Sequence, residues 1–194
     1  TIVMFSSDNG PHQEGGHHVA YFQSNDGLTG MKRDLTEGGV REPFIVRWPG
    51  RIKPGTVSEH VSGFQDFLPT AADLAGVKVT AECDGISFLP TLLGHNDHQR
   101  QHPYMFWYGS EKGGKRSVLK WPWKLLHLNT GSPDQSDESE KSTAKKRPAA
   151  AKPLVVQLFN LETDPAESKN VAAENPELVK ELETIMKQAW RDPS

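Results

Sequence analysis

The chain has 194 residues, with 22 basic and 25 acidic side chains, a formal net charge of −3 and a hydrophobic share of 35%. This balance is typical of an ordinary globular protein and excludes the general basic field that nucleic-acid binding requires. No apolar run approaches the roughly 18 residues of a membrane span, and no charged start with an apolar core indicates a signal peptide. We therefore expect no nucleic-acid or membrane partner, and a chain that is mature, cytosolic or a fragment.

Apolar runs alternate with turn signals through the first part of the chain. Ile2 to Phe5 predicts a strand, and because the run is unbroken it suits a strand buried on both faces of a parallel sheet. Phe44 to Val46 predicts a second strand. A helix is predicted from about Phe64 to Leu74, with Gly76 as its stop. The apolar face of this helix comprises Phe64, Phe67, Leu68, Ala71 and Leu74.

Short aromatic-rich runs begin near Pro103 and change the character of the chain. Residues 104–110, 116–128 and 154–161 predict antiparallel strands separated by turns. Between the last two runs, residues 131–153 are first acidic and then basic and contain almost nothing to bury. We predict a mobile loop there.

A helix is predicted at the end of the chain, with Asn175 as its cap and Pro176 at its first position. We expect its apolar stripe to pack on the small sheet. The stripe comprises Leu178, Leu182, Ile185, Met186 and Ala189. Together these elements predict an α/β chain in two parts, with residues 1–102 belonging to an α/β domain and residues 103–194 forming a small antiparallel-sheet subdomain with a carboxy-terminal helix.

The stretch FSSDNGPHQEGGHH, residues 5–18, places Asp8 and Asn9 directly after the first predicted strand. Asp-Asn-Gly is ordinary turn chemistry, but open α/β sheets also place their sites at such strand ends. Oxygen ligands of this kind suit calcium or magnesium. Calcium takes about six to eight oxygens and this pair supplies only two or three, so the pair forms part of a site at most. The acidic residues nearby, Glu14, Asp26, Asp34 and Glu37, follow no recognisable metal-loop spacing.

Three histidines, His12, His17 and His18, follow in a glycine-rich loop. Zinc could use imidazoles, but adjacent histidines cannot both face one point on a regular strand. Hydrogen bonding to a substrate, proton transfer and simple exposure all remain open.

The segment GMKRDLTEGGVREP, residues 30–43, contains more charged residues that could take part in binding. Glu37-Gly38-Gly39 implies a backbone in conformations that only glycine adopts comfortably. Lys32, on such a turn, could present a positive charge to a sulfate or phosphate oxyanion, or form a solvated basic pair with Arg33. Glu37 and Arg41 are four apart and predict a buried structural ion pair.

Several of these stretches together resemble the carboxy-terminal part of a sulfatase of the arylsulfatase family, in the alkaline-phosphatase-like superfamily. They are FSSDNGP, GMKRDLTEGGVREPFIVRWPG, QDFLPTAADLAG, and finally WKLLHL with LFNLETDPAESKNVA. The resemblance implies an alkaline-phosphatase-like α/β domain followed by a smaller antiparallel sheet. It also implies that Asp8 and Asn9 bind calcium, with magnesium less favoured, and that Lys32 contacts the sulfate group. The candidates for substrate contacts are His12, His17 and His18.

The nucleophile that the resemblance implies is a formylglycine, made from the cysteine or serine of a C-x-P-S-R type motif. That motif is absent from these residues. The single cysteine, Cys83, stands in CDGIS, and we predict a structural or incidental role for it. The other calcium carboxylates are missing too. We therefore expect a carboxy-terminal portion that is inactive without its amino-terminal part.

The resemblance implies hydrolysis of a sulfate ester, carried by an aryl compound or a glycan. Two alternatives remain open. One is a phosphodiesterase or phosphonate monoester hydrolase of the same superfamily, because the same groups bind phosphoryl oxygens. The other is a non-catalytic binding module on the same scaffold. The family implies a secreted, periplasmic or lysosomal location, which the residues themselves do not determine.

Overall fold

The computed structural model forms two compact units and describes residues 1–80, 82–109, 114–130 and 153–190. The first unit contains residues 1–7 and 43–103, and the second contains residues 8–42 and 104–194. The segment 8–42, which carries every predicted site residue, therefore belongs to the same compact unit as the carboxy-terminal sheet. The division into domains at residues 102 and 103 concerns the whole fold and stays a prediction.

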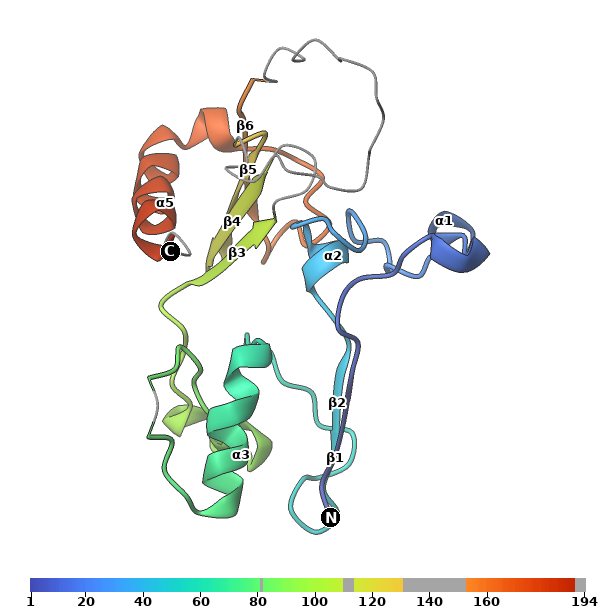
Figure 1. The fold of residues 1–194 in the computed structure, drawn as a ribbon, viewed down its shortest axis with the longest axis vertical. Helices are drawn as coiled ribbons and strands as arrows, with labels where there is room; N and C mark the ends of the chain where they lie inside the picture. Colours follow the sequence, from blue (N-terminus) through green and yellow to red (C-terminus); the bar gives the residue numbers. More distant parts are fainter. Residues whose placement is uncertain (81, 110–113, 131–152, 191–194) are drawn as a thin grey trace, which may run out of the picture. The chain divides into compact units, whose positions relative to one another are not determined.

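The first unit has a two-stranded antiparallel ladder, in which β1 (Val3–Ser6) pairs with β2 (Phe44–Arg47) (Figure 1). Val3, Phe5 and Ile45 are 51%, 61% and 62% exposed. The prediction of a parallel strand buried on both faces is therefore wrong for the described chain. Val3, Phe5 and Ile45 lie on one face, since side chains alternate along a strand, and the described residues leave that face uncovered.

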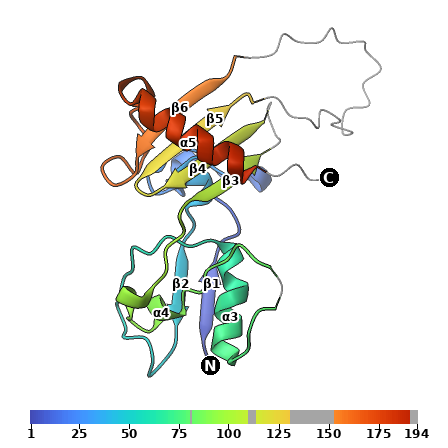
Figure 2. The same cartoon turned by 90° about the vertical axis from the view of Figure 1, so that its left-hand side faces the viewer.

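The predicted helix near residue 64 begins as a 3-10 turn, η2 (Phe64–Asp66), and continues as α3 (Phe67–Ala75). It ends at Gly76, whose φ of 69° is left-handed, so the predicted helix and its stop are confirmed. Figure 2 shows α3 beside β1. An apolar groove separates the two, lined by Ile2, Met4, Phe67, Ala71, Leu74 and Ala75.

A buried carboxylate, Asp66, ties the rest of the first unit together. Its oxygens accept the backbone N–H groups of Gly63 at 2.8 Å and Ile86 at 2.7 Å, and His102 Nε2 lies 2.8 Å and 3.0 Å from them. Two short helices complete the unit, α4 (Leu89–Leu92) and the 3-10 turn η3 (Asn96–His98).

The second unit is built around an antiparallel sheet in the order β3-β4-β5-β6. Its strands are β3 (Met105–Gly109), β4 (Lys115–Lys120), β5 (Trp123–Leu128) and β6 (Val155–Asn160). The remaining helices are η1 (Glu14–Gly16), α1 (Val19–Phe22), α2 (Glu37–Val40), η5 (Ala172–Glu174) and α5 (Pro176–Ala189). The predicted antiparallel strands are confirmed, with residues 116–128 forming a hairpin. The predicted mobile loop lies outside the described residues apart from Pro153.

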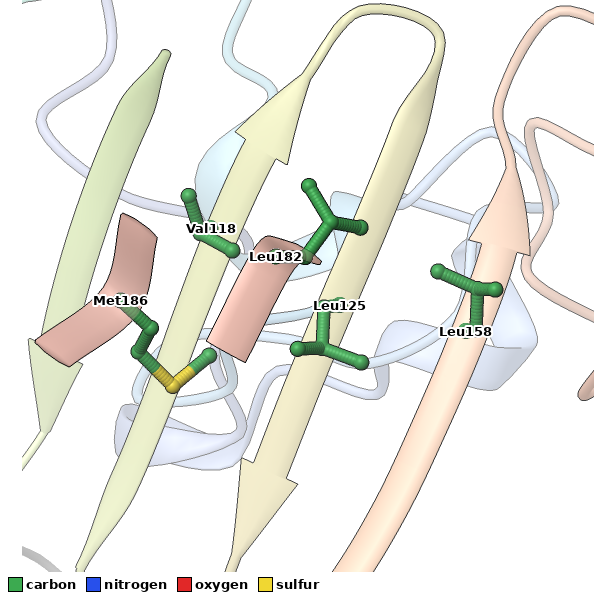
Figure 3. Packing of buried hydrophobic residues seen from close by; sticks show 5 residues of the cluster. All are labelled: Val118, Leu125, Leu158, Leu182 and Met186. Carbon is green, nitrogen blue, oxygen red and sulfur yellow. The ribbon is translucent and has the colours of Figure 1, made fainter. Parts of the chain in front are cut away.

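The core of the second unit lies between α5 and one face of the sheet. Figure 3 shows its most buried members, which are Val118, Leu125, Leu158, Leu182 and Met186. Four residues of the predicted apolar stripe of α5 are therefore confirmed as part of this core, namely Leu178, Leu182, Ile185 and Met186. Pro176 opens the helix as predicted, whereas the Asn175 side chain donates to Val171 O at 2.9 Å instead of capping the helix. No helix in the described ranges is long and apolar enough to cross a membrane.

The other face of the sheet is covered by α2 and the segment around it, which lie on the side opposite α5 (Figure 1). Lys115 and Lys124 both point to this face, because each alternates with the core residues Val118 and Leu125 that face α5. The carboxy-terminal sheet is therefore packed on two sides, by a hydrophobic helix and by the site segment.

Candidate active site

The Asp8-Asn9-Gly10 turn packs directly against the glycines of α2. Gly10 N donates to Gly39 O at 3.2 Å, and a Cβ built on Gly10 would lie 2.0 Å from Gly38 O. Gly38 and Gly39 have helical backbone angles, so the prediction that they adopt conformations comfortable only for glycine is wrong. Glycine is required because backbones approach closely: a Cβ on Gly39 would lie 2.2 Å from Asp34 O.

Lys32 lies on a tight turn that is hydrogen-bonded to the residue after the D-N-G turn. Asp34 N donates to Met31 O at 2.8 Å, and Arg33 adopts a left-handed φ of 76°. The backbone N–H of Lys32 donates to the carbonyl of Pro11, the residue after Gly10, at 2.9 Å. The structure therefore brings together the D-N-G turn and the Lys32 turn, which are well separated in the sequence.

Asp8 and Asn9 form an oxygen-rich pair. The Asn9 amide donates to Asp8 Oδ1, so the two side chains lie against each other. Glu42 lies close enough to matter electrostatically: burial raises the pKa of its carboxyl, and the Asp8 carboxylate raises this pKa further. Glu42 Oε1 is buried and has no hydrogen-bond partner within the described part of the chain. A negative potential of this kind favours a cation beside Asp8.

The described residues offer only part of a metal site. Among them, no group of three or more His, Cys, Asp or Glu side chains converges as a metal site would. Asp8 and Asn9 fit calcium in chemistry, since a carboxylate and an amide oxygen are the ligands that it prefers. Their number falls short of the six to eight that calcium takes, as the sequence predicts. The role of both residues as ligands stays a prediction.

Lys32 holds an anionic group. Its Nζ lies 3.2 Å from Glu14 Oε2, and Arg33 Nη1 lies 3.0 Å from Glu14 Oε1, so two cations surround one carboxylate. The hydrogen bond from Lys32 and its charge, followed by the charge of Arg33, lower the pKa of Glu14. The predicted sulfate contact of Lys32 stays a prediction; the anion that Lys32 and Arg33 bind here is the carboxylate of Glu14.

The three predicted histidines have different surroundings. His12 Nδ1 accepts the backbone N–H of Glu14 at 3.0 Å, which brings it close to the Lys32 ion pair. His17 Nε2 lies 2.7 Å from Ser24 Oγ, and its ring stacks on Phe22 at a centroid distance of 5.1 Å. His18 immediately precedes α1 and is exposed. Only His12 is thus placed near Lys32 by the contacts of its own side chain.

Glu37 forms the predicted ion pair with Arg41 at 3.8 Å, and Glu37 is buried, but Arg41 is half exposed. The closer partner is the fully buried Lys124, whose Nζ lies 2.7 Å from Glu37 Oε1. Lys115, also buried, makes a similar contact with Asp34 at 2.7 Å. Neither lysine is predicted from the sequence. Each alternates with core residues on its strand, which places it on the opposite face of the sheet but does not indicate that this face is covered.

A family model described as Sulfatase matches residues 1–77, which include Asp8, Asn9 and Lys32. Arylsulfatase A of Bos taurus is 34% identical over 97% of this chain, and an N-acetylgalactosamine-6-O-sulfatase of Bacteroides thetaiotaomicron is 31% identical over 96%. The chain spans 38% and 35% of the length of these two relatives.

Among solved structures, that of Ps i-CgsB in complex with k-i-k-neocarrahexaose superimposes with a TM-score of 0.71 and 26% identity. The superposition covers 100% of this chain and 38% of that one. The predicted mixed α/β fold class is confirmed by this likeness.

Proposed function

Because the chain belongs to the sulfatase family, we propose that it is the carboxy-terminal part of an enzyme that hydrolyses a sulfate ester. The reaction adds water across the S–O bond and yields an alcohol and sulfate. Most of the length of the two relatives named above lies outside the part that this chain matches, which leaves room for the ligands and the nucleophile that the site lacks. On this proposal the chain is inactive by itself.

One observation carries the proposal. Gly10 of the D-N-G turn packs on Gly38 and Gly39, and the Lys32 backbone is bonded to Pro11, so the turn with the proposed metal ligands and the turn with the proposed sulfate contact share one location. An enzyme that cleaves an anionic ester needs both features, because negative charge on the ester oxygens must be stabilised as the bond breaks.

Lys32 binds and orients the sulfate group, and its charge stabilises the sulfate oxygens in the transition state. Asp8 and Asn9 supply part of the coordination of a calcium ion, which would add its own positive charge beside those oxygens. A formylglycine in an upstream segment would supply the nucleophile. His12 lies beside the Lys32 ion pair and is the first candidate for a contact with the leaving group, followed by His17 and His18.

A sulfated glycan is the proposed substrate class. The names of the N-acetylgalactosamine-6-O-sulfatase and of the neocarrahexaose complex support it, since both refer to sugars. The loop that carries the histidines is exposed and polar, as a surface that binds sugar hydroxyls should be.

The experiment measures turnover of a chromogenic aryl sulfate, a sulfated oligosaccharide and the matching aryl phosphate by the chain joined to its natural upstream segment. Lys32→Ala should lower kcat/KM for the sulfate esters by about 10²–10³-fold, as loss of one oxyanion donor does elsewhere. Lys180→Ala, on the exposed surface of α5, is the matched control. Unchanged turnover in Lys32→Ala would contradict the role of Lys32, and preference for the phosphate would favour a phosphodiesterase instead.

A further inference from the structure

Two buried lysines of the carboxy-terminal sheet reach across to the site segment. Lys115 on β4 is 7% exposed, and Lys124 on β5 is 0% exposed. Lysine is rarely buried in this way unless it is paired, because its charge must be stabilised away from water. The oxygen atoms that pair with these two lysines lie on loops or short helices, and they connect the lysines to Lys32 and to Asp8.

Lys115 clamps the turn that carries Lys32. Its Nζ donates to Arg33 O at 3.0 Å and to Asp34 Oδ1 at 2.7 Å. The other oxygen of Asp34 accepts the backbone N–H of Met31 at 3.2 Å. Met31, Arg33 and Asp34 are thus all held by the Lys115–Asp34 pair. These bonds fix the backbone on both sides of Lys32 and therefore the direction in which its side chain leaves the turn.

Lys124 clamps α2. Its Nζ lies 2.7 Å from Glu37 Oε1 and 3.0 Å from Glu167 Oε1. The second oxygen of Glu167 accepts the backbone N–H of Glu37 at 2.6 Å, so both the side chain and the start of α2 are held. Gly10 packs on the next two residues of α2, which links Lys124 to the D-N-G turn through contacts that a Cβ would break.

The side chains of α2 itself offer little packing, because α2 has four residues and two of them are glycine. An ion pair buried in low dielectric is directional and costly to break, since a lone buried charge is left behind. Lys115 and Lys124 add directional contacts of this kind to a segment in which the buried Leu35 supplies apolar packing.

We propose that Lys115 and Lys124 are positioning residues for the sulfate-ester site, Lys115 acting through Asp34 on Lys32 and Lys124 acting through Glu37 on Asp8 and Asn9. This inference rests on the proposed function. It assigns the carboxy-terminal sheet a part in activity, in addition to its part in the fold.

The experiment uses the enzyme that includes the upstream segment, with Lys115→Met, Lys124→Met and the control Lys120→Met. Lys120 also lies on β4, but it is exposed and pairs with Glu181 on the α5 side. We expect Lys115→Met and Lys124→Met to lower kcat/KM by roughly 10–100-fold, the range found for groups that orient the residues in direct contact with a metal or substrate. Lys120→Met should stay near wild type.

Two readouts separate positioning from a general loss of structure. Lys115→Met should mainly raise KM for the sulfate ester and weaken inhibition by free sulfate. Lys124→Met should mainly raise the calcium concentration that gives half-maximal turnover. A variant that is only less folded would lower kcat per total protein but leave KM and the half-maximal calcium concentration unchanged. That result would overturn the inference.

Coupling is tested with near-isosteric partners. If Lys115 acts through Asp34, the double variant Lys115→Met with Asp34→Asn should be no worse than the more damaged single variant. Effects that multiply would refute action through Asp34. The same comparison applies to Lys124→Met with Glu37→Gln, and these milder single variants replace any lysine variant that fails to fold.

Hydrogen exchange on the same enzyme tests the positioning without activity. Lys115→Met should speed exchange of the Lys32 amide, which is bonded to Pro11 O, while amides inside α5 keep wild-type rates. If the wild type hydrolyses no sulfate ester, the proposed function fails, and exchange still decides whether the two lysines hold the segment. Unchanged exchange over residues 29–42 in both variants would overturn the positioning itself.

Discussion

Replacing Gly10 with alanine tests the contact on which the candidate site depends. The new Cβ would lie 2.0 Å from Gly38 O and 2.8 Å from Gly39 Cα, whereas ordinary contact begins at 3.4 Å. The D-N-G turn and α2 must therefore separate by about 1.4 Å, because both opposing atoms belong to the backbone and neither can rotate away. Gly10→Ala should thus move Asp8 and Asn9 relative to the Lys32 turn.

The expected magnitudes follow from that displacement. Overpacking of this kind costs typically about 1–3 kcal/mol, which urea unfolding of the chain would measure as a lower midpoint. In the enzyme with its upstream segment, a shift of about 1 Å in the reacting geometry lowers turnover by about 10²-fold. Gly109→Ala is the control, since its Cβ would meet Leu35 and Lys115 at 3.9 Å and 4.0 Å, which is ordinary contact.

A Gly10→Ala protein with the stability and turnover of the wild type would refute the importance of this close approach. A protein with wild-type stability but reduced turnover would retain the geometric argument and correct only its energy. Equal losses in Gly10→Ala and Gly109→Ala would show that the close approach is not the cause.

Three further predictions concern other charged groups. Glu14→Gln should lower KM for an anionic substrate by a few-fold at most, since it removes the carboxylate that pairs with Lys32 and exposed ion pairs are weak; a raised KM would contradict this. Burial lowers the pKa of His127 below its usual 6.5, so the unfolded chain takes up a proton first and the folded chain loses stability as pH falls below 6.5. Tm of His127→Gln should therefore fall less between pH 7 and pH 5 than Tm of the wild type, and parallel Tm curves would refute this role of His127. Asp66→Asn should destabilise the first unit by about 3 kcal/mol in urea unfolding, because it weakens a fully buried set of hydrogen bonds, and a loss below about 1 kcal/mol would contradict the role of Asp66.

Local periodicity predicts most of the second unit. The apolar stripe of α5 and the alternation in β4 and β5 are properties of short segments, and the same short range explains why Gly76 is recognisable as a helix stop. These signals need no knowledge of distant residues. The predicted pairing of β1 is wrong, because an unbroken apolar run cannot say which strand lies beside it. Its antiparallel partner β2 follows only after the whole site segment, so no short window of sequence contains both strands.

The sequence predicts which residues belong to the candidate site, but it predicts little of how they are arranged in space. Asp8, Asn9 and Lys32 are candidates because of their motifs, but those motifs do not give the reason for the glycines. Gly38 and Gly39 avoid contacts with backbones from other segments, whereas a sequence suggests first the local explanation of a left-handed φ. A close approach between distant segments, such as that of Gly10 to Gly38, leaves no periodic trace.

Buried lysines are the hardest feature to predict, because lysine is among the residues most often exposed. On β4, the alternation of Lys115 with Arg116 and of Ser117 with Val118 assigns polar groups to both faces of the strand. Only the structure shows that one of these faces meets acidic loops. Two of the acidic residues that the sequence offers as possible metal ligands are paired there instead, Asp34 with Lys115 and Glu37 with Lys124.

These pairings explain how a segment rich in glycine can hold a site of defined geometry. Glycine allows backbones to approach closely, but it contributes no side chain that would select one arrangement of them. Apolar side chains of similar volume in place of the buried ion pairs would stabilise the fold as much as the pairs do, or more, since burying charge is costly. It would not specify where the carboxylates of Asp34 and Glu37 must lie. On the proposed function, the buried lysines therefore fix the position of the site segment, which binding of a small tetrahedral anion requires more than additional stability.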